Sequence, residues 1–264
     1  MPPRSTGTPR PTATTSPTDS LVLQLVPGVT LELVRVSAGT FLMGSTDADK
    51  DAWDHEKPQR SVHLDEYLVD KYPVTVAQWR AFVQASGYKG SPSALRQGKE
   101  DHPVTNVTWN DAQTFCAWAS EVTGRPVQLP TEAQWEKAAR GTDGRIYPWG
   151  DAFNPALANT AEGGPGSTTA VGRYRSSDSP YGCADMAGNV WEWTSSLYRD
   201  YPYRAGDGHE DAANDSEYRI VRGGSWDYYQ RVARCAYRRR LFPNYRNFDL
   251  GFRVVVTLAS SLSG

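Results

Sequence analysis

Hydrophobic and polar residues alternate in three short stretches near the start of the chain. Residues 21–26, 30–36 and 40–43 are rich in Leu, Val, Thr and Phe, and they are separated by Pro27-Gly28 and Gly39. Runs of this kind, bounded by turn residues, are typical of antiparallel strands. We therefore expect a β-meander over residues 21–44 and expect the folded part of the chain to begin there.

Three later segments carry the signature of a capped helix. Thr75, Thr108 and Thr131 each stand three residues before a Gln or Asp that can return a hydrogen bond, as in a capping box, and each segment ends at a glycine. Apolar residues recur on one face of each predicted helix: Trp79, Phe82 and Val83; Ala112, Phe115, Cys116, Ala119 and Val122; and Trp135, Ala138 and Ala139. The helices should pack on a core that includes Cys116.

The stretch 222–253 has no period of 2 or 3.6, so neither a half-buried strand nor an amphipathic helix explains it. Two kinds of position alternate instead. One kind resembles a scaffold that includes Trp226 as a buried anchor and Arg234, Arg238 and Arg246 as donors to loop carbonyls. Between these positions lie aromatic, basic, acidic and aliphatic residues of the kind that form contact surfaces.

Composition agrees with a loop-rich globular chain. The 264 residues are 39% hydrophobic and 22% charged, and 14 Tyr and 9 Trp accompany 23 Gly and 18 Pro. A net charge of −2 gives no bulk attraction to nucleic acid or to an anionic membrane. No apolar run is long enough to cross a membrane, and no signal-peptide core is visible, so we expect no direct membrane insertion and assign no compartment.

Cysteine usage excludes two further classes. Cys116, Cys183 and Cys235 are isolated in sequence, which indicates neither a disulfide framework nor a zinc site. Residues 1–20 are rich in Pro, Thr and Ser and have almost nothing to bury. We interpret them as a disordered tail or linker, with a cloning or gene-start artefact as the alternative, and we assign 21–264 to one folded domain.

Eight motifs occur in a fixed order: GTFLMGS, PVTVAQWRAF, HPVTNVTWNDAQTFCAW, RPVQLPTEAQWEKAARG, YPWG, GNVWEWT, VRGGSW and LGFRVV. Together they resemble the formylglycine-generating, sulfatase-modifying-factor domain, a branch of the C-type lectin fold. The resemblance implies an α+β fold, irregular and loop-rich, with short antiparallel strands and a few helices.

The enzymes of that family bind copper through two cysteines that follow the GGS motif. Here no thiol follows Gly223-Gly224-Ser225 before Cys235, and one thiolate cannot make a two-sulfur copper site. We therefore expect no copper and no catalytic residues, so that the chain is not an enzyme. An oxygen-dependent oxidoreductase of the formylglycine-generating type, or an inactive structural paralogue, is the alternative.

The stretch that ends in GFR also resembles the variable region of diversity-generating retroelement proteins, in which template adenines, commonly in AAC codons, are randomised. Glu, Lys, Met and Trp cannot arise from such a codon, and none occurs between Asp227 and Leu250. The resemblance implies a variable region at about 223–253 that binds an unknown protein or other macromolecule. Nucleic acid is not expected as a partner, because of the net charge of −2. The predicted binding residues are Asp227, Tyr228, Tyr229, Arg231, Val232, Tyr237, Arg239, Arg240, Leu241, Phe242, Tyr245, Asn247, Phe248 and Asp249.

The resemblance to the enzymes also implies a structural Ca²⁺. Its ligand positions match Asp185, Gly188, Val190 and Glu192, which can supply carboxylate and carbonyl oxygens. A second family site maps onto Asn159 and Thr160, but its acidic position falls at Gly163.

Overall fold

The N-terminal strands form the edge of a five-stranded sheet. The computed structural model describes residues 20–97, 99–202, 209–211 and 214–258, so the predicted tail lies almost wholly outside the described residues. The sheet has the order β1-β2-β5-β11-β6. Its strands are β1 (Ser20–Val26), β2 (Val29–Val36), β5 (Tyr67–Asp70), β6 (Val127–Gln128) and β11 (Val255–Thr257). β11, the last strand of the described residues, pairs with both β5 and β6 and so lies inside this sheet.

The expected meander is only partly correct. β1 and β2 form an antiparallel pair, but β3 (Gly39–Met43) leaves the sheet and pairs with β4 (Arg60–Leu64) in a separate two-stranded ribbon. Gly39, with φ of 130°, marks the point of departure. A positive φ is readily available only to glycine, which gives the chain this change of direction.

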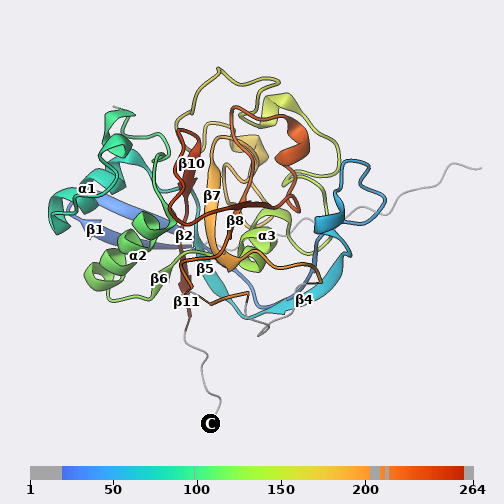
Figure 1. Cartoon of the computed structure of the whole chain (residues 1–264), viewed down its shortest axis with the longest axis horizontal. Coiled ribbons are helices and arrows are strands. Elements are labelled where there is room, and N and C mark those ends of the chain that lie inside the picture. Colours follow the sequence, from blue (N-terminus) through green and yellow to red (C-terminus); the bar gives the residue numbers. More distant parts are fainter. Residues whose placement is uncertain (1–19, 98, 203–208, 212–213, 259–264) are drawn as a thin grey trace, which may run out of the picture.

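A four-stranded sheet carries the C-terminal stretch (Figure 1). Its order is β10-β7-β8-β9, with β7 (Trp191–Leu197), β8 (Arg219–Arg222), β9 (Arg239–Leu241) and β10 (Leu250–Phe252). β10 runs parallel to β7 and the other pairs are antiparallel. The stretch therefore leaves the sheet after β8, returns as the edge strand β9, and ends on the opposite edge as β10.

The three predicted helices are present with their predicted caps: α1 (Val76–Ser86), α2 (Trp109–Thr123) and α3 (Glu132–Arg140). In each, the N-cap Thr accepts from the backbone of the third helical residue, whose side chain accepts in return. Short 3₁₀ turns occupy Asp54–Glu56, Pro92–Gln97, Pro155–Leu157, Arg175–Ser177 and Gln230–Val232.

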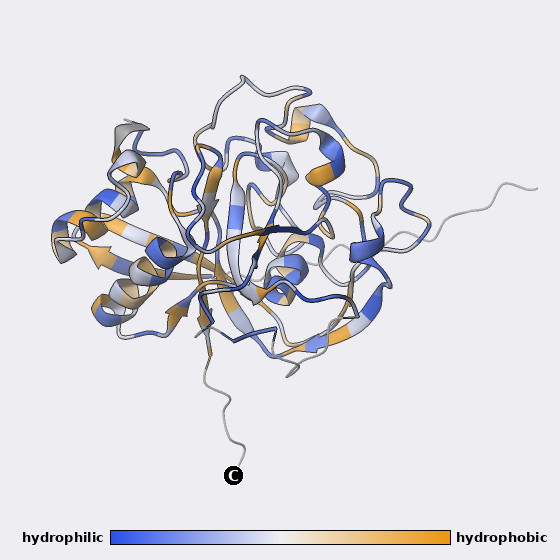
Figure 2. Ribbon diagram, in the orientation of Figure 1, coloured by the Kyte–Doolittle hydropathy of each residue, from blue (hydrophilic) through white to orange (hydrophobic). Residues whose placement is uncertain are grey.

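Aromatic rings fill the core between these helices and the sheets. Trp79 of α1 stacks on Phe115 of α2 with centroids 6.1 Å apart, and Phe252 of β10 meets both rings edge-on. Cys116 is buried in the same cluster, as predicted. Val122 was wrongly placed on the buried face, because it lies in the last turn of α2 with 42% of its surface exposed. Hydrophobic and hydrophilic residues alternate around the helices (Figure 2).

Buried ion pairs also stabilise the fold. Glu132 of α3 receives Nε and Nη2 of Arg238 at 2.8 and 2.7 Å, and Arg222 of β8 approaches it at 3.2 Å. Burial alone would raise the pKa of Glu132, but the two guanidinium groups hold it below its usual value. The carboxylate therefore stays ionised inside the protein.

No helix in the described part of the chain is long and apolar enough to span a membrane.

We predict that Glu132→Ala destabilises the fold by about 3 to 5 kcal/mol, because removing one partner of a buried pair leaves the other charge uncompensated. The matched change Glu121→Ala lies on an exposed position of α2 and should alter stability by about 0.5 kcal/mol or less. Urea unfolding at neutral pH measures both. Since the pKa of Glu132 is lowered on folding, its contribution should be lost as the pH falls through that folded-state pKa. Equal stabilities for the two variants would contradict the prediction.

Candidate functional site

The predicted binding residues separate into two groups by exposure. Most are exposed or half-buried: Asp227, Tyr228, Tyr229, Arg231, Arg239, Arg240, Leu241, Phe242, Tyr245, Asn247 and Phe248. Val232, Tyr237 and Asp249 are buried, at 7%, 8% and 1% exposure, so the expectation that their side chains point to solvent is wrong. Val232 packs into the main core, and Asp249 accepts a hydrogen bond of 2.7 Å from Ser225 Oγ.

The stretch is held by its backbone turns and by β8. Gly223 and Gly224 both have positive φ, and a Cβ on Gly224 would lie 3.1 Å from the Cα of Ala233. This close approach requires glycine at that point. From β8, Arg222 Nη1 donates to the carbonyl oxygens of Cys235 at 3.0 Å and Tyr237 at 2.7 Å. Arg222 thus holds the loop backbone at Cys235 and at Tyr237 against the sheet.

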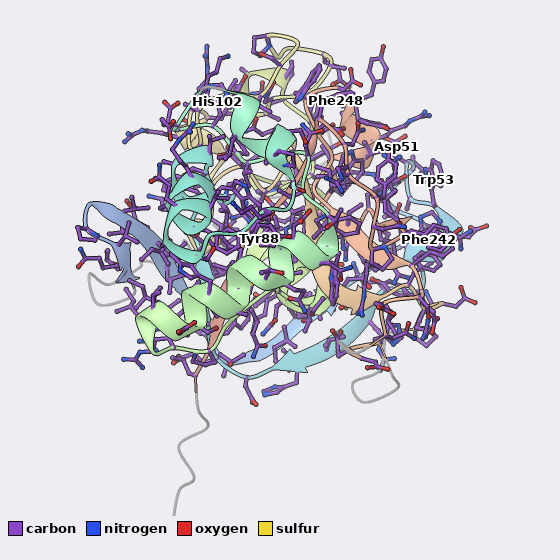
Figure 3. All side chains as sticks on the ribbon, turned by 60° about the vertical axis from the view of Figure 1, so that its left-hand side comes forward. Asp51, Trp53, Tyr88, His102, Phe242 and Phe248 are labelled. Atoms are coloured by element: carbon purple, nitrogen blue, oxygen red, sulfur yellow. The ribbon has the colours of Figure 1, made fainter. Side chains whose placement is uncertain are left out.

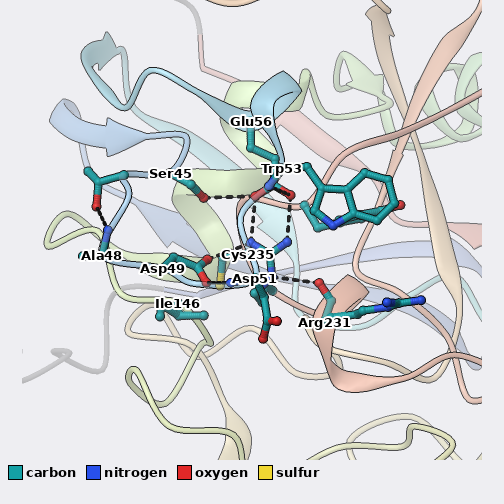
Figure 4. A network of polar contacts seen from close by, with 12 residues as sticks. Ser45, Ala48, Asp49, Asp51, Trp53, Glu56, Ile146, Arg231 and Cys235 are labelled. Atoms are coloured by element: carbon teal, nitrogen blue, oxygen red, sulfur yellow. Dashed lines mark hydrogen bonds and ion pairs between the residues drawn. The ribbon is translucent and has the colours of Figure 1, made fainter.

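Arg234 supplies the third attachment. Its Nη1 and Nη2 donate to Glu56 at 2.7 Å each, and Nη1 also donates to Asp49 at 2.7 Å (Figure 4). Arg234 and Arg238 were expected to serve loop carbonyls. They do donate to carbonyls, but their main partners are carboxylates. Arg246 is exposed and donates to Ser91 Oγ at 3.2 Å, so its expected scaffold role is wrong.

Trp226 is half-buried, and the expectation of a buried anchor is also wrong. Its ring lies 5.4 Å from that of Phe248, and together they line one side of a cavity of about 410 Å³. The other lining residues are Lys99, His102, Thr105, Asn106, Ser167 and Thr168. Burial and the nearby Lys99 lower the pKa of His102, which favours the neutral form of this ring. His102 and Phe248 lie at the upper end of the molecule in Figure 3.

Aromatic contacts continue on the other side of the loop. Tyr237 packs edge-on against Trp53 at 5.7 Å and lies 5.8 Å from Trp191. Arg239 Nη1 donates to the hydroxyl of Tyr228 at 2.9 Å, and its guanidinium lies over both Trp191 and Tyr228. Trp53 and His55 were given no role from the sequence. Only the tertiary contact with Tyr237 identifies them.

All three cysteines are buried, and burial raises the pKa of each thiol, to about 11 for Cys183. Cys235 lies in a core cluster with Trp135 of α3. A raised pKa disfavours the thiolate, which is the form that attacks a substrate or binds a metal.

The predicted calcium ligands differ in how well they fit a cation. Asp185 is buried, and this burial, together with a smaller effect of Glu192, raises its pKa to about 6. Glu192 fits less well, because its two oxygens already accept from Arg253 at 2.6 and 2.7 Å. At the second position, Asn159 Oδ1 and Thr160 Oγ1 are buried and have no hydrogen-bond partner among the described residues. Gly188 joins the two positions through a bridge to Asn159.

Comparison with known proteins identifies the family. A family model described as "Sulfatase-modifying factor enzyme 1-like domain" matches residues 26–258. "Inactive C-alpha-formylglycine-generating enzyme 2" of Bos taurus is 30% identical over 88% of this chain and 90% of the relative. "Formylglycine-generating enzyme" of Streptomyces coelicolor is 31% identical over 83% of this chain and 87% of the relative. Identity therefore does not separate active from inactive relatives.

Among solved structures, "Treponema denticola variable protein 1" superposes with a TM-score of 0.76 at 22% identity, covering 91% of this chain and 99% of that protein. This likeness shows a shared fold. With the family match, it confirms the predicted α+β fold of the formylglycine-generating subtype.

The difference between exposed and buried residues among the predicted binding residues leads to a stability prediction. Tyr229 and Tyr245 are 63% and 41% exposed, so replacing both with Ser should change the free energy of unfolding by about 1 kcal/mol or less. Tyr237→Ser removes a buried aromatic ring from its contacts with Trp53 and Trp191, and should cost about 3 to 5 kcal/mol. Thermal melts of the two variants test this. A double variant that unfolds beside a Tyr237→Ser variant that melts like wild type would refute the division.

Proposed function

This chain belongs to the sulfatase-modifying factor enzyme 1-like family, and we propose that it is a ligand-binding display protein. Its binding surface consists of the exposed residues of the C-terminal variable region. One observation carries the proposal. Within 222–253, buried arginines and glycines hold the loop in place, while the aromatic and basic side chains between them are exposed to solvent.

The composition of the exposed group supports binding. Tyr229, Phe242, Tyr245 and Phe248 expose between 41% and 63% of their surface. Such residues are a liability on a protein that binds nothing, and they are the residues that dominate binding hot spots. Because the loop is attached to β8, β9 and β10, little conformational entropy is lost when a ligand binds.

We propose that diversification by a retroelement generates this surface. Support comes from the reachable codons of the region, the GFR ending and the shared fold with a variable protein. The alternative is an oxygen-dependent oxidoreductase, and the likeness to the formylglycine-generating enzyme of Streptomyces coelicolor supports it. Against it, the cysteines are buried and their thiol pKa values are raised. Copper-dependent oxidation of a cysteine peptide, lost in Cys235→Ala, would favour that alternative.

Sequencing this gene from many cells of one population tests the display proposal. We predict that substitutions concentrate at the exposed codons of 227–249, while Arg234, Arg238 and the codons for Gly223 and Gly224 stay fixed. A similar template repeat and a reverse transcriptase gene should lie nearby. Substitutions spread evenly along the gene, with no template repeat, would contradict diversification.

A structural cation is a further part of the proposal. We propose that one Ca²⁺ binds between Asp185 and the backbone carbonyls of Gly188 and Val190, where a hard cation would offset the cost of burying the Asp185 carboxylate. Neighbouring oxygens of Asn159 and Thr160 are available to the same region.

Chelation provides the test. We predict that EDTA lowers the melting temperature of the wild type and that added Ca²⁺ restores it, because a ligand of the native state alone stabilises that state. Asp185→Asn should melt at one temperature with or without chelator. A wild-type transition that EDTA leaves unchanged would exclude a stabilising calcium.

A further inference from the structure

Guanidinium groups and aromatic rings alternate in a stack that runs from the interior to the surface. Arg238, paired with Glu132, lies 4.2 Å from the ring centroid of Tyr201 and 4.9 Å from that of Tyr198. Arg240 lies 4.8 Å from Tyr198 and 5.2 Å from Tyr218. We call this set the arginine–aromatic stack, and in order outward it contains Tyr201, Arg238, Tyr198, Arg240, Tyr218 and Phe242.

The outer end of the stack is open to solvent. The rings of Tyr218 and Phe242 lie only 4.0 Å apart, yet they remain 37% and 48% exposed. Arg240 is exposed, and within the described part of the chain it has ring contacts but neither an ion pair nor a side-chain hydrogen bond. Stacking involves the face of a guanidinium group, which leaves its N–H edge free to bind a planar acceptor.

Charge indicates which acceptor suits this surface. Four arginines of the variable region are exposed or half-buried, Arg231, Arg239, Arg240 and Arg246, against the single exposed acid Asp227. The whole chain, by contrast, carries a net charge of −2. Exposed and half-buried arginines therefore outnumber exposed acids within this stretch, and Arg240 lies beside the exposed rings of Tyr218 and Phe242. A carboxylate matches the fork of an arginine, and an apolar side chain matches the rings beside it.

We propose that the outer end of the stack docks an acidic segment of a partner protein, with an Asp or Glu on Arg240 and an adjacent apolar side chain on Phe242 and Tyr218. The proposal rests on the display function and deepens it by naming the chemistry of the partner. A nucleic acid fits less well, because phosphate backbones are held by many cations and this chain is acidic overall. Tyr198 and Tyr218 lie outside the variable region, so fixed residues contribute to the contact.

The experiment selects binders from a displayed random peptide library on the full-length chain. We expect enrichment of peptides in which Asp or Glu stands beside an aromatic or aliphatic residue. A synthetic copy of an enriched peptide should bind the Arg240→Gln variant about tenfold more weakly, the range of a lost charge-assisted hydrogen bond. Arg240→Lys should recover only part of this loss, because it keeps the charge without the fork.

Arg125→Gln is the matched control, since it makes the same change at an exposed arginine just beyond α2 and should leave peptide affinity unchanged. Enriched peptides whose affinity falls in the Tyr229, Tyr245 double variant but not in Arg240→Gln would overturn this inference and leave the display function standing. Failure to enrich any peptide would contradict this inference, whereas the display function is tested separately by the sequencing of the gene. Binding of heparin or single-stranded DNA that depends on Arg240, without peptide binding, would replace the protein partner by a polyanion.

Discussion

Buried pairing between arginine and glutamate is the interaction on which the C-terminal region depends. Arg234 pairs with Glu56, Arg238 with Glu132 and Arg253 with Glu192, and every one of these side chains is at most 1% exposed. Each pair joins the same C-terminal stretch to a different element: the 3₁₀ turn before β4, helix α3 and strand β7. Because an unpaired buried charge is very costly, each arginine has one acceptable position. The path of the loop between them is fixed accordingly.

Because these ion pairs hold the loop in place, most of the predicted binding side chains in this stretch are not needed for the fold. Three of them are nevertheless buried. Val232 follows two residues after Gln230 within a 3₁₀ turn, and that turn directs it into the core. Asp249 comes immediately before β10, and its carboxylate accepts a hydrogen bond from the Ser225 hydroxyl. Tyr237 lies between the buried Arg234 and Arg238 in the sequence, and its ring packs against Trp53 and Trp191. The proposed binding surface is therefore smaller than the stretch 223–253 that contains it.

The sequence predicts what is local and misses what is distant. The capping boxes at Thr75, Thr108 and Thr131 were predictable because donor and acceptor are three residues apart. The acids that hold Arg234 and Arg238 lie 178 and 106 residues away, and no sequence pattern connects them. Hence arginines were expected to serve nearby carbonyls. The family resemblance predicted the fold, because its motifs occur in the expected order along the chain. It could not predict how exposed each side chain is.

Trp226 illustrates the same limit. A tryptophan after a double-glycine turn is reasonably expected to be buried, yet its ring forms a cavity wall with Phe248, a residue 22 positions later. His102 and Thr168, which hydrogen-bond to each other at 2.9 Å, also line this cavity. Residues outside the stretch 223–253 therefore border it here, as Tyr198 and Tyr218 do at the arginine–aromatic stack. Under the proposed diversification, substitutions within 227–249 would change one part of each contact and leave the other constant. Such a surface would favour ligands that suit its constant rings.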